Sequence, residues 1–474
     1  MRTLSQYDLT GIQPFLFGAR RLRANLGASW IVHTALAVDG WLGEAAGGAG
    51  STVLWSGGGN AVVDSPDEAT ARQVATTLAL RMVVEAPGLG VVCAHRTWAG
   101  DYPMTARALR DDLEVAKATR PGGALFDGGG VCEPCRDTAE AALARDGEGS
   151  PVGASIYARE GARHHAEDRL KRAFVLPTGL VWSDDIDELG RTTGEESALG
   201  VIHLDGNGMG RKFAEASGRG LEDVRYLSRH VEAAGRATLV AGLRWVADRA
   251  STDSIGFGLA KREGGKAHVF PVRPVVFGGD DLTLLCDGRI ALDLAAAMLN
   301  AWHAESKFHA CAGVAIVRPH FPFYRAVEHA HALCKEAKHW RKENLTDDTS
   351  LLHWSLHRAG GVTEERVAHT ARPYVVVGAP PRGKTWRSWA WFRHDCLRAL
   401  QKDTDHHTQI KGVAEALAAG PDVARPALGR LVDRHGLRLP TPPHHHLDVS
   451  GFEAGETPYL DALELLDLIP GVLS

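Results

Sequence analysis

The sequence predicts a mixed α+β protein in which two tandem sandwiches share one order of elements. First, the apolar runs of residues 3–98 and 198–318 both read as strand, helix, strand, turn, strand, helix and strand. Second, a Gly-Gly turn falls at the matching place in each order, at residues 58–59 and 278–279. Third, residues 384–474 are rich in Ala and Leu, which favours helices. We therefore expect a duplicated domain followed by a small helical one.

The first copy is expected over residues 1–118. Its first strand ends in Asp8, and residues 51–64 read as two strands around a glycine-rich turn. Ser65-Pro66-Asp67-Glu68 is a good helix start, because it combines a cap, a proline and acidic residues. In this copy we align Gly58-Gly59-Asn60-Ala61 with Gly278-Gly279-Asp280-Asp281 of the second copy. Asn60 and Ala61 are poor metal ligands, so the first copy is predicted to be catalytically inactive.

Residues 119–197 differ in sequence pattern from the two copies that flank them and are expected to form an insertion. Cys132 and Cys135 have the Cys-x-x-Cys spacing of half a zinc knuckle, which is the basis for an expected Zn²⁺. A complete site needs two further ligands, and His164 or His165 is a candidate for one of them. The alternative is that the two cysteines are simply thiols near a turn.

The second copy is expected over residues 198–358, and the stretch FGGDDLTLL (277–285) is its central feature. Apolar runs on both sides predict a hairpin with Asp280 and Asp281 at its tip. Gly278 and Gly279 give the turn freedom and let a phosphate group approach without a Cβ in the way. Two carboxylates on a rigid tip suit Mg²⁺ or Mn²⁺. The alternative is an ordinary charged turn.

A third carboxylate strengthens the functional interpretation. VIHLDGNGMG (201–210) reads as a strand that ends in Asp205 and enters a glycine-rich loop. If this strand and the hairpin are neighbours in one sheet, Asp205 lies beside Asp280 and Asp281. Three carboxylates so placed are what two-metal phosphoryl transfer requires. Residues 324–338 then read as a helix, 350–357 as an edge strand, and 359–474 as a mainly helical C-terminal domain.

Composition limits the compartment and the partners. The net charge of −5 does not indicate an overall surface that binds nucleic acid. The seven cysteines are irregularly spaced and do not indicate a framework of disulfides. No apolar run has the length of a membrane span, so we expect no membrane partner. A reducing cytoplasm is the expected location.

These motifs resemble those of a known family, the palm-domain polymerase-like subunit of type III CRISPR effector complexes, or a free-standing relative of it. The resemblance is carried by four segments that lie within residues 1–355: 7–30, 204–213, 271–288 and 311–338. It implies two tandem ferredoxin-like palm domains, the first degenerate and the second carrying the GGDD motif. The family commonly has a second cysteine pair in the insertion, which this chain lacks.

The resemblance also implies an activity, namely joining ATP into cyclic oligoadenylate signals for antiviral defence. Asp205, Asp280 and Asp281 would hold two divalent ions. The residues implied to contact the nucleotide are Gly206, Asn207, Gly208, Gly278, Gly279 and Lys338. The implied partners are ATP, a guide RNA or CRISPR-type subunits. Two palms facing each other could also build one composite site, within a chain or across a homodimer.

Two other functions stay open at this point. The chain could be a non-catalytic nucleotide sensor or a scaffold of a ribonucleoprotein complex, because a fold can persist after its catalytic activity is lost. It could also be a diguanylate-type cyclase that uses GTP. Against the cyclase, the second acid of the motif is Asp281 rather than glutamate, and Leu282 follows it rather than phenylalanine.

Overall fold

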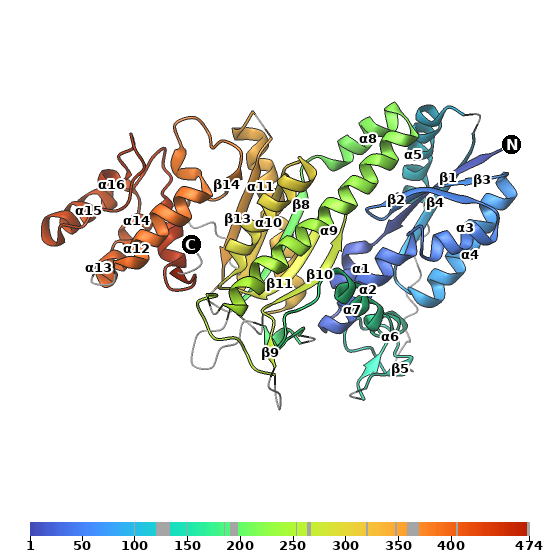
Figure 1. The fold of residues 1–474 in the computed structure, drawn as a ribbon, viewed down its shortest axis with the longest axis horizontal. Coiled ribbons are helices and arrows are strands. Elements are labelled where there is room, and N and C mark those ends of the chain that lie inside the picture. Colours follow the sequence, from blue (N-terminus) through green and yellow to red (C-terminus); the bar gives the residue numbers. More distant parts are fainter. Residues whose placement is uncertain are drawn as a thin grey trace.

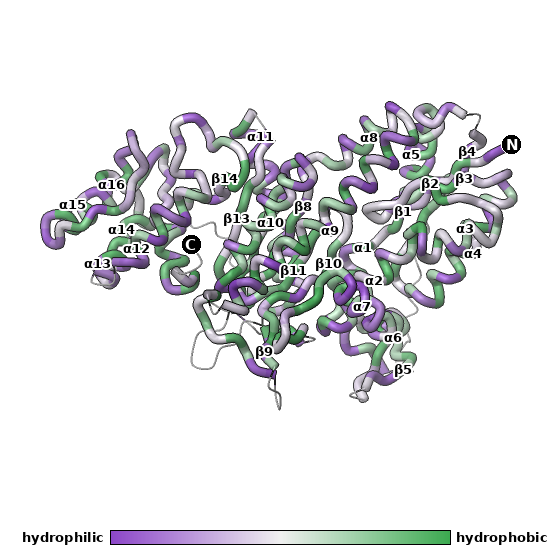
Figure 2. The backbone as a smooth tube through the Cα atoms, in the orientation of Figure 1, coloured by the Kyte–Doolittle hydropathy of each residue, from purple (hydrophilic) through white to green (hydrophobic). Residues whose placement is uncertain are grey.

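The computed structural model describes residues 1–471 except 99, 120–132, 148, 184, 190–197, 253, 263–266, 319–320, 347, 358–368 and 404–405. The chain runs from an N-terminal sheet at one end, through a second sheet in the middle, to helices at the other end (Figure 1). The strands of the second sheet are largely hydrophobic, those of the first sheet are more mixed, and helix α7 is strongly hydrophilic (Figure 2). No described helix is long and apolar enough to span a bilayer.

The first sheet has the order β2-β3-β1-β4, and its neighbouring strands are antiparallel. Its strands are β1 (Thr3–Thr10), β2 (Thr52–Gly57), β3 (Asn60–Ser65) and β4 (Gly90–Thr97). Its helices are α1 (Ile12–Phe17), α2 (Leu22–Ala35), α3 (Trp41–Gly48), α4 (Glu68–Glu85) and α5 (Tyr102–Thr119). Helix α4 starts as predicted, because the Asp67 side chain accepts a 2.8 Å hydrogen bond from the Thr70 amide.

The second sheet has the order β10-β11-β8-β12-β13-β14. Its strands are β8 (Leu199–Gly206), β10 (Val272–Gly278), β11 (Asp281–Asp287), β12 (Ala310–Val317), β13 (Ser350–Leu356) and β14 (Tyr374–Val377). Its helices are α8 (Met209–Arg219), α9 (Leu221–Ser251), α10 (Ala291–Ser306) and α11 (Phe323–Asn344). We had expected β13 to be an edge strand. It is an inner strand, because β14 pairs with its other side. The sheet thus continues into residues that we had assigned to the C-terminal domain.

The two sheets repeat one topology, which confirms the predicted fold class. Strands β10-β11-β8-β12 have the same order as β2-β3-β1-β4, and helices enter the two units at equivalent places. In the second unit, α9 and α10 cover the face that carries Ile202 and Leu204. Helix α11 covers the opposite face, which carries Val201. Because side chains alternate along a strand, odd-numbered residues of β8 face α11.

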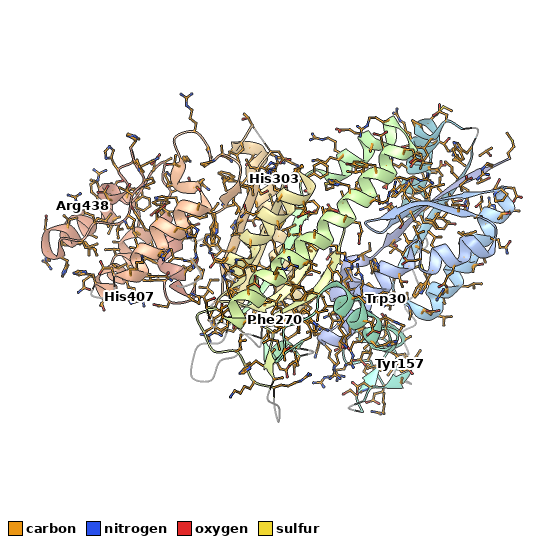
Figure 3. All side chains as sticks on the ribbon, in the orientation of Figure 1. Trp30, Tyr157, Phe270, His303, His407 and Arg438 are labelled. Carbon is orange, nitrogen blue, oxygen red and sulfur yellow. The ribbon has the colours of Figure 1, made fainter. Side chains whose placement is uncertain are left out.

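The insertion packs against the first unit. Its described elements are β5 (Ala144–Arg145), β6 (Pro151–Val152), α6 (Ala154–Gly161), α7 (Arg163–Ala173), β7 (Leu180–Val181) and a 3-10 turn at Ile186–Glu188. Strand β7 pairs with β9 (His268–Val269) of the second unit. Trp30 and Tyr157, labelled in Figure 3, line a cavity of about 840 Å³ between insertion and first unit.

The C-terminal region is mainly helical, as expected. Its elements are a 3-10 turn (Thr385–Arg387), a π-helix (Trp391–Leu397), α12 (Arg398–Lys402), α13 (His407–Gly412), α14 (Ala414–Ala418), α15 (Pro421–His435), α16 (Leu447–Ser450) and α17 (Pro458–Leu465). A fully buried pair joins this region to the second unit, with Arg393 Nε donating to Asp293 Oδ1 at 2.9 Å.

Candidate active site

The three predicted aspartates lie together at one end of the second sheet. Strands β8 and β11 are antiparallel neighbours, and their register sets Asp281 directly opposite Asp205. Opposite residues in such a pair have Cβ atoms about 5 Å apart. Asp280 occupies the turn, where its carbonyl accepts a 3.3 Å hydrogen bond from the Gly206 amide. The fold thus brings residues that are distant in sequence next to one another at the end of this sheet.

Glycines at this point are required by close packing. Gly279 has φ +62°, and its carbonyl oxygen would lie 1.9 Å from a Cβ added at Gly235 of α9. A Cβ on Gly206 would lie 2.9 Å from Asp280 Cβ. Around Gly278, by contrast, an added Cβ would make ordinary contacts, with Glu232 Oε2 at 3.8 Å and an Arg169 guanidinium nitrogen at 3.9 Å. Close packing at Gly206 and Gly235 and the positive φ of Gly279 therefore require glycine more strictly than the surroundings of Gly278 do.

The carboxylates hold protons more tightly than ordinary aspartates. Burial and the nearby Asp205 charge raise the pKa of Asp280 to about 6. Burial, Asp205 and Asp280 together raise the pKa of Asp281 to about 7. Oδ1 of Asp281 is buried and has no hydrogen-bond partner among the described residues. A buried acceptor without a donor, beside two further acids, is the donor set that a hard divalent cation takes.

Lys338 lies at the site, as the family resemblance in the sequence implied. Its Nζ donates to Asp205 Oδ2 at 2.5 Å and to the Gly206 carbonyl at 2.8 Å. Burial lowers the pKa of Lys338, but the Asp205 carboxylate outweighs it, so this pKa lies above its usual value. Lys338 therefore carries a full positive charge within reach of the acids.

The loop that follows β8 is held from behind by Asn207. Its side chain is 1% exposed and donates to Asp348 Oδ1 at 2.9 Å and to the Thr349 carbonyl at 3.0 Å. Gly208 has φ +64° and starts α8. The Asn207 side chain thus anchors the loop to the start of β13, and any contact of this residue with a nucleotide would come from its backbone.

The first unit repeats part of this arrangement. Asp8 is opposite Asn60 in the pairing of β1 with β3, just as Asp205 is opposite Asp281. Lys117 of α5 lies 2.5 Å from Asp8 Oδ2. Sequence reasoning missed Lys117, although it stands fifteen positions after the start of α5, the same offset that Lys338 has in α11.

The register also corrects our alignment of the two turns by one residue. Gly57 pairs with Asn60, and Gly278 pairs with Asp281, so two residues lie inside each turn. The positions equivalent to Asp280 and Asp281 are therefore Gly59 and Asn60, rather than the predicted Asn60 and Ala61. The slip arose because the first unit has three consecutive glycines, which let the Gly-Gly pair be placed in two ways.

A cavity of about 340 Å³ lies between the two units. Gly57 and Gly58 of the first turn and Gly279 and Asp280 of the second turn border it. Aromatic residues line it, among them Trp55 and Phe213 of α8, whose rings stack with their centroids 6.4 Å apart. Trp55 Nε1 also donates to the hydroxyl of Tyr102 at 2.9 Å. The volume of this cavity lies at the lower end of the range for small-ligand sites.

The predicted zinc ligands are only partly described. Cys132 lies outside the described residues, whereas Cys135 is buried near β6. His165 stacks on Trp30 at 5.3 Å rather than standing with Cys135 in any cluster of metal-binding atoms among the described residues. The zinc site of Cys132 and Cys135 stays a prediction.

Comparison with known proteins agrees with the resemblance seen in the sequence. Residues 198–346 match the family model for Cas10/Cmr2, second palm domain. Similar solved chains come from the Csm1–Csm4 cassette in complex with cA3 (14% identity, 99% of this chain and 70% of that chain, TM-score 0.60) and with one ATP (16%, 99% and 70%, 0.60).

A third similar chain comes from the Csm1–Csm4 subcomplex in the type III-A CRISPR-Csm interference complex (15% identity, 100% of this chain and 70% of that chain, TM-score 0.59). No curated protein matches the sequence. At these identities the solved structures establish the fold. Together with the family model they confirm the predicted likeness to the palm-domain subunit of type III CRISPR systems.

Proposed function

We propose, from the Cas10/Cmr2-type second palm domain in residues 198–346, that this chain is a nucleotidyltransferase that joins ATP into cyclic oligoadenylates. The reaction is attack by the 3′-hydroxyl of one nucleotide on the α-phosphate of the next, with release of pyrophosphate. The observation that carries the proposal is the register that sets Asp281 opposite Asp205, with Asp280 in the adjoining turn, where it borders the cavity between the two units.

The acids supply the ligands for two divalent cations, Mg²⁺ or Mn²⁺. When bound, such ions activate an attacking hydroxyl and stabilise a leaving pyrophosphate. Asp205 and Asp281, opposite each other on a rigid sheet, would hold the ions, and Oδ1 of Asp281, which has no hydrogen-bond partner among the described residues, is a candidate ligand atom. Burial, and after it the repulsion between the acids, raises both hairpin pKa values, and bound cations would offset that repulsion.

Lys338 and the glycines serve the phosphates. The ammonium of Lys338, which pairs with Asp205 here, would be available to the triphosphate if divalent ions were held by Asp205. Gly278, which carries no Cβ, would allow the α-phosphate to approach, and the backbone of Gly206, Asn207 and Gly208 shapes the loop beside it. These groups position the phosphates but do not choose the base.

The aromatic cavity serves the nucleobase. Trp55 and Phe213 offer ring faces on which the base can stack. Removing one such ring is expected to weaken nucleotide binding by about 1–3 kcal/mol. Because both palms line the cavity, a composite site forms within one chain, and a homodimer is not needed to build it. CRISPR-type subunits and a guide RNA are proposed partners, since the similar Csm1 structures come from a cassette with Csm4 and from an interference complex.

The test is product analysis from each of the four ribonucleoside triphosphates with Mg²⁺ or Mn²⁺, by pyrophosphate release and mass spectrometry. Adenylate oligomers are expected from ATP, and none from Asp280→Ala/Asp281→Ala. Products only from GTP would point to the diguanylate-type reaction instead. Tight ATP binding without turnover, or co-purifying RNA with salt-sensitive binding, would contradict the enzymatic proposal and favour a sensor or a scaffold.

A further inference from the structure

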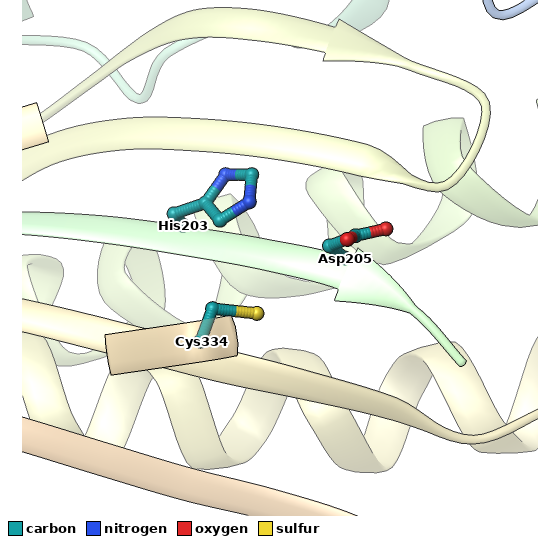
Figure 4. A group of neighbouring side chains, drawn as sticks. All are labelled: His203, Asp205 and Cys334. Carbon is teal, nitrogen blue, oxygen red and sulfur yellow. The ribbon is translucent and has the colours of Figure 1, made fainter. Parts of the chain in front are cut away.

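We propose that His203, Asp205 and Cys334 form a second metal site, suited to a transition-metal ion such as Zn²⁺ or Co²⁺ rather than Mg²⁺. Ligand atoms of these three side chains all lie within 4.8 Å of one another. Among the described residues, no other group of His, Cys, Asp and Glu side chains meets this spacing. The site lies beneath the hairpin, on the α11 side of the sheet (Figure 4).

Periodicity explains why the three residues meet. His203 and Asp205 are two apart on β8, so both point to the face that α11 covers. Cys334 and Lys338 are four apart on α11, so they share the face that meets β8. Cys334 thus stands across from His203, and Lys338 across from Asp205. Figure 4 shows the three ligands grouped around the end of β8.

The chemistry of the donors selects the class of metal. An imidazole nitrogen and a thiolate sulfur are poor ligands for Mg²⁺ and good ones for Zn²⁺ or Co²⁺. His203 is 6% exposed and Cys334 is 1% exposed, whereas 39% of the Asp205 side chain is exposed and gives access. Metal binding would displace the thiol proton of Cys334 to solvent and end its hydrogen bond to the Cys311 carbonyl.

Two neighbours support this set. Oδ1 of Asp281, buried and without a hydrogen-bond partner among the described residues, lies 3.4 Å from His203 Nδ1 and adds negative charge beside the three ligands. The ring of His331 stacks on that of His203 at 3.7 Å and holds its orientation. The ligand set is one nitrogen, one sulfur and one carboxylate oxygen, which leaves a position for water in a tetrahedral site.

The site shares Asp205 with the proposed Mg²⁺ centre. Zn²⁺ bound here would withdraw Asp205 from that centre, so it is expected to inhibit nucleotidyl transfer. This consequence rests on the proposed function, whereas the metal site itself does not.

Cobalt spectroscopy tests the site without any need for activity. The chelator-treated full chain is titrated with Co²⁺, and the expected result is a sulfur-to-cobalt charge-transfer band with the visible spectrum of a tetrahedral ion. Cys334→Ala should remove this band and weaken Co²⁺ and Zn²⁺ binding at least about tenfold, the order seen when a metal-site partner is lost. All variants are made in a Cys132→Ser/Cys135→Ser background, which removes the thiols of the separately predicted zinc site, and Cys396→Ala in that background is the control that should keep the band.

Circular dichroism identifies variants that fail to fold, and His203→Gln is a second variant that should weaken binding while leaving the thiol in place. A thiolate band that survives in Cys334→Ala, or the absence of any band in the folded wild type, would overturn the proposal. A separate assay measures Zn²⁺ inhibition of pyrophosphate release, normalised to the Mg²⁺-dependent rate of each variant. Cobalt binding without pyrophosphate release would refute the proposed function and leave the metal site standing.

Discussion

The two palm units have one topology and differ in chemistry at a single turn. Both place an aspartate at the end of the first strand, Asp8 or Asp205, and both pair it with a lysine at the same position of a helix. Only the second adds two carboxylates, where the first has Gly59 and Asn60. The comparison teaches that the sheet alone does not make a site. The two units differ in the carboxylates that the second hairpin carries.

In the first unit the aspartate is satisfied within the fold. Lys117 neutralises Asp8, and no carboxylate opposes it. Gly59 has φ +77° and an added Cβ would come within 2.8 Å of Ile12 Cδ1, so an aspartate is poorly tolerated there. In the second unit three acids share one lysine, and burial together with the neighbouring negative charge raises the pKa values of Asp280 and Asp281. That unit is therefore the one expected to attract cations.

The largest expected difference concerns the matched aspartates. Asp205→Asn should lower the rate of pyrophosphate release by about 10²–10³-fold, because it removes a metal ligand worth several kcal/mol in the transition state. Asp8→Asn should change the rate less than about threefold. Steady-state kinetics with ATP and Mn²⁺ measures both, and equal losses in the two variants would break the comparison.

The paired lysines should differ next. Lys338→Met should reduce kcat/KM for ATP about tenfold or more, because a charge-assisted hydrogen bond to phosphate is lost. Lys117→Met should leave kcat/KM nearly unchanged, since its partner lies in the unit without the acid pair. A KM for ATP that is unaffected by Lys338→Met would show that this lysine serves only the fold.

Cation affinity should depend on pH. The pKa values near 6 and 7 mean that Asp280 and Asp281 are protonated at low pH and must lose protons to bind a metal. Mn²⁺ affinity should therefore rise as pH increases from 5.5 to 7.5, by at least about tenfold, and level off above. Calorimetric titration at several pH values measures this. Asp281→Asn should remove the upper part of the rise, and a flat profile in the wild type would contradict the assignment.

The smallest effect is on stability without metal. The pKa of Asp281 is raised in the folded protein, so the stability present at low pH is lost as pH rises through about 7. In EDTA at pH 8, Asp281→Asn should melt about 1–2 °C higher than the wild type, and the gain should vanish near pH 4. Asp8→Asn should melt lower at pH 8, because it breaks an ion pair. Scanning calorimetry distinguishes the two signs.

Much of this arrangement was predictable because it follows periodic patterns. The apolar runs predicted both sheets, and the hairpin followed from the apolar residues around Gly278 and Gly279. The likeness to palm domains drew attention to Lys338. The exact register of the first turn was not predictable, since three adjacent glycines carry no side chains to fix a face.

Contacts between distant segments were the harder part. The partnership of Lys117 with Asp8 needed the two units to be aligned helix by helix, and only then does the shared offset appear. His203 and Cys334 look like ordinary core residues in their own segments, and only the packing of α11 on β8 joins them. The pairing of β14 with β13 likewise depends on the path of the chain after β13.

The most direct measurement is a crystal structure of the full chain with Mn²⁺ and a non-hydrolysable ATP analogue, with the ions located by anomalous scattering. Two manganese peaks are expected, contacted by Asp205, Asp280 and Asp281, with the α-phosphate near Gly278 and the base in the Trp55 and Phe213 cavity. Manganese bound to the analogue away from these aspartates, or no peak beside them at saturating Mn²⁺, would contradict the account.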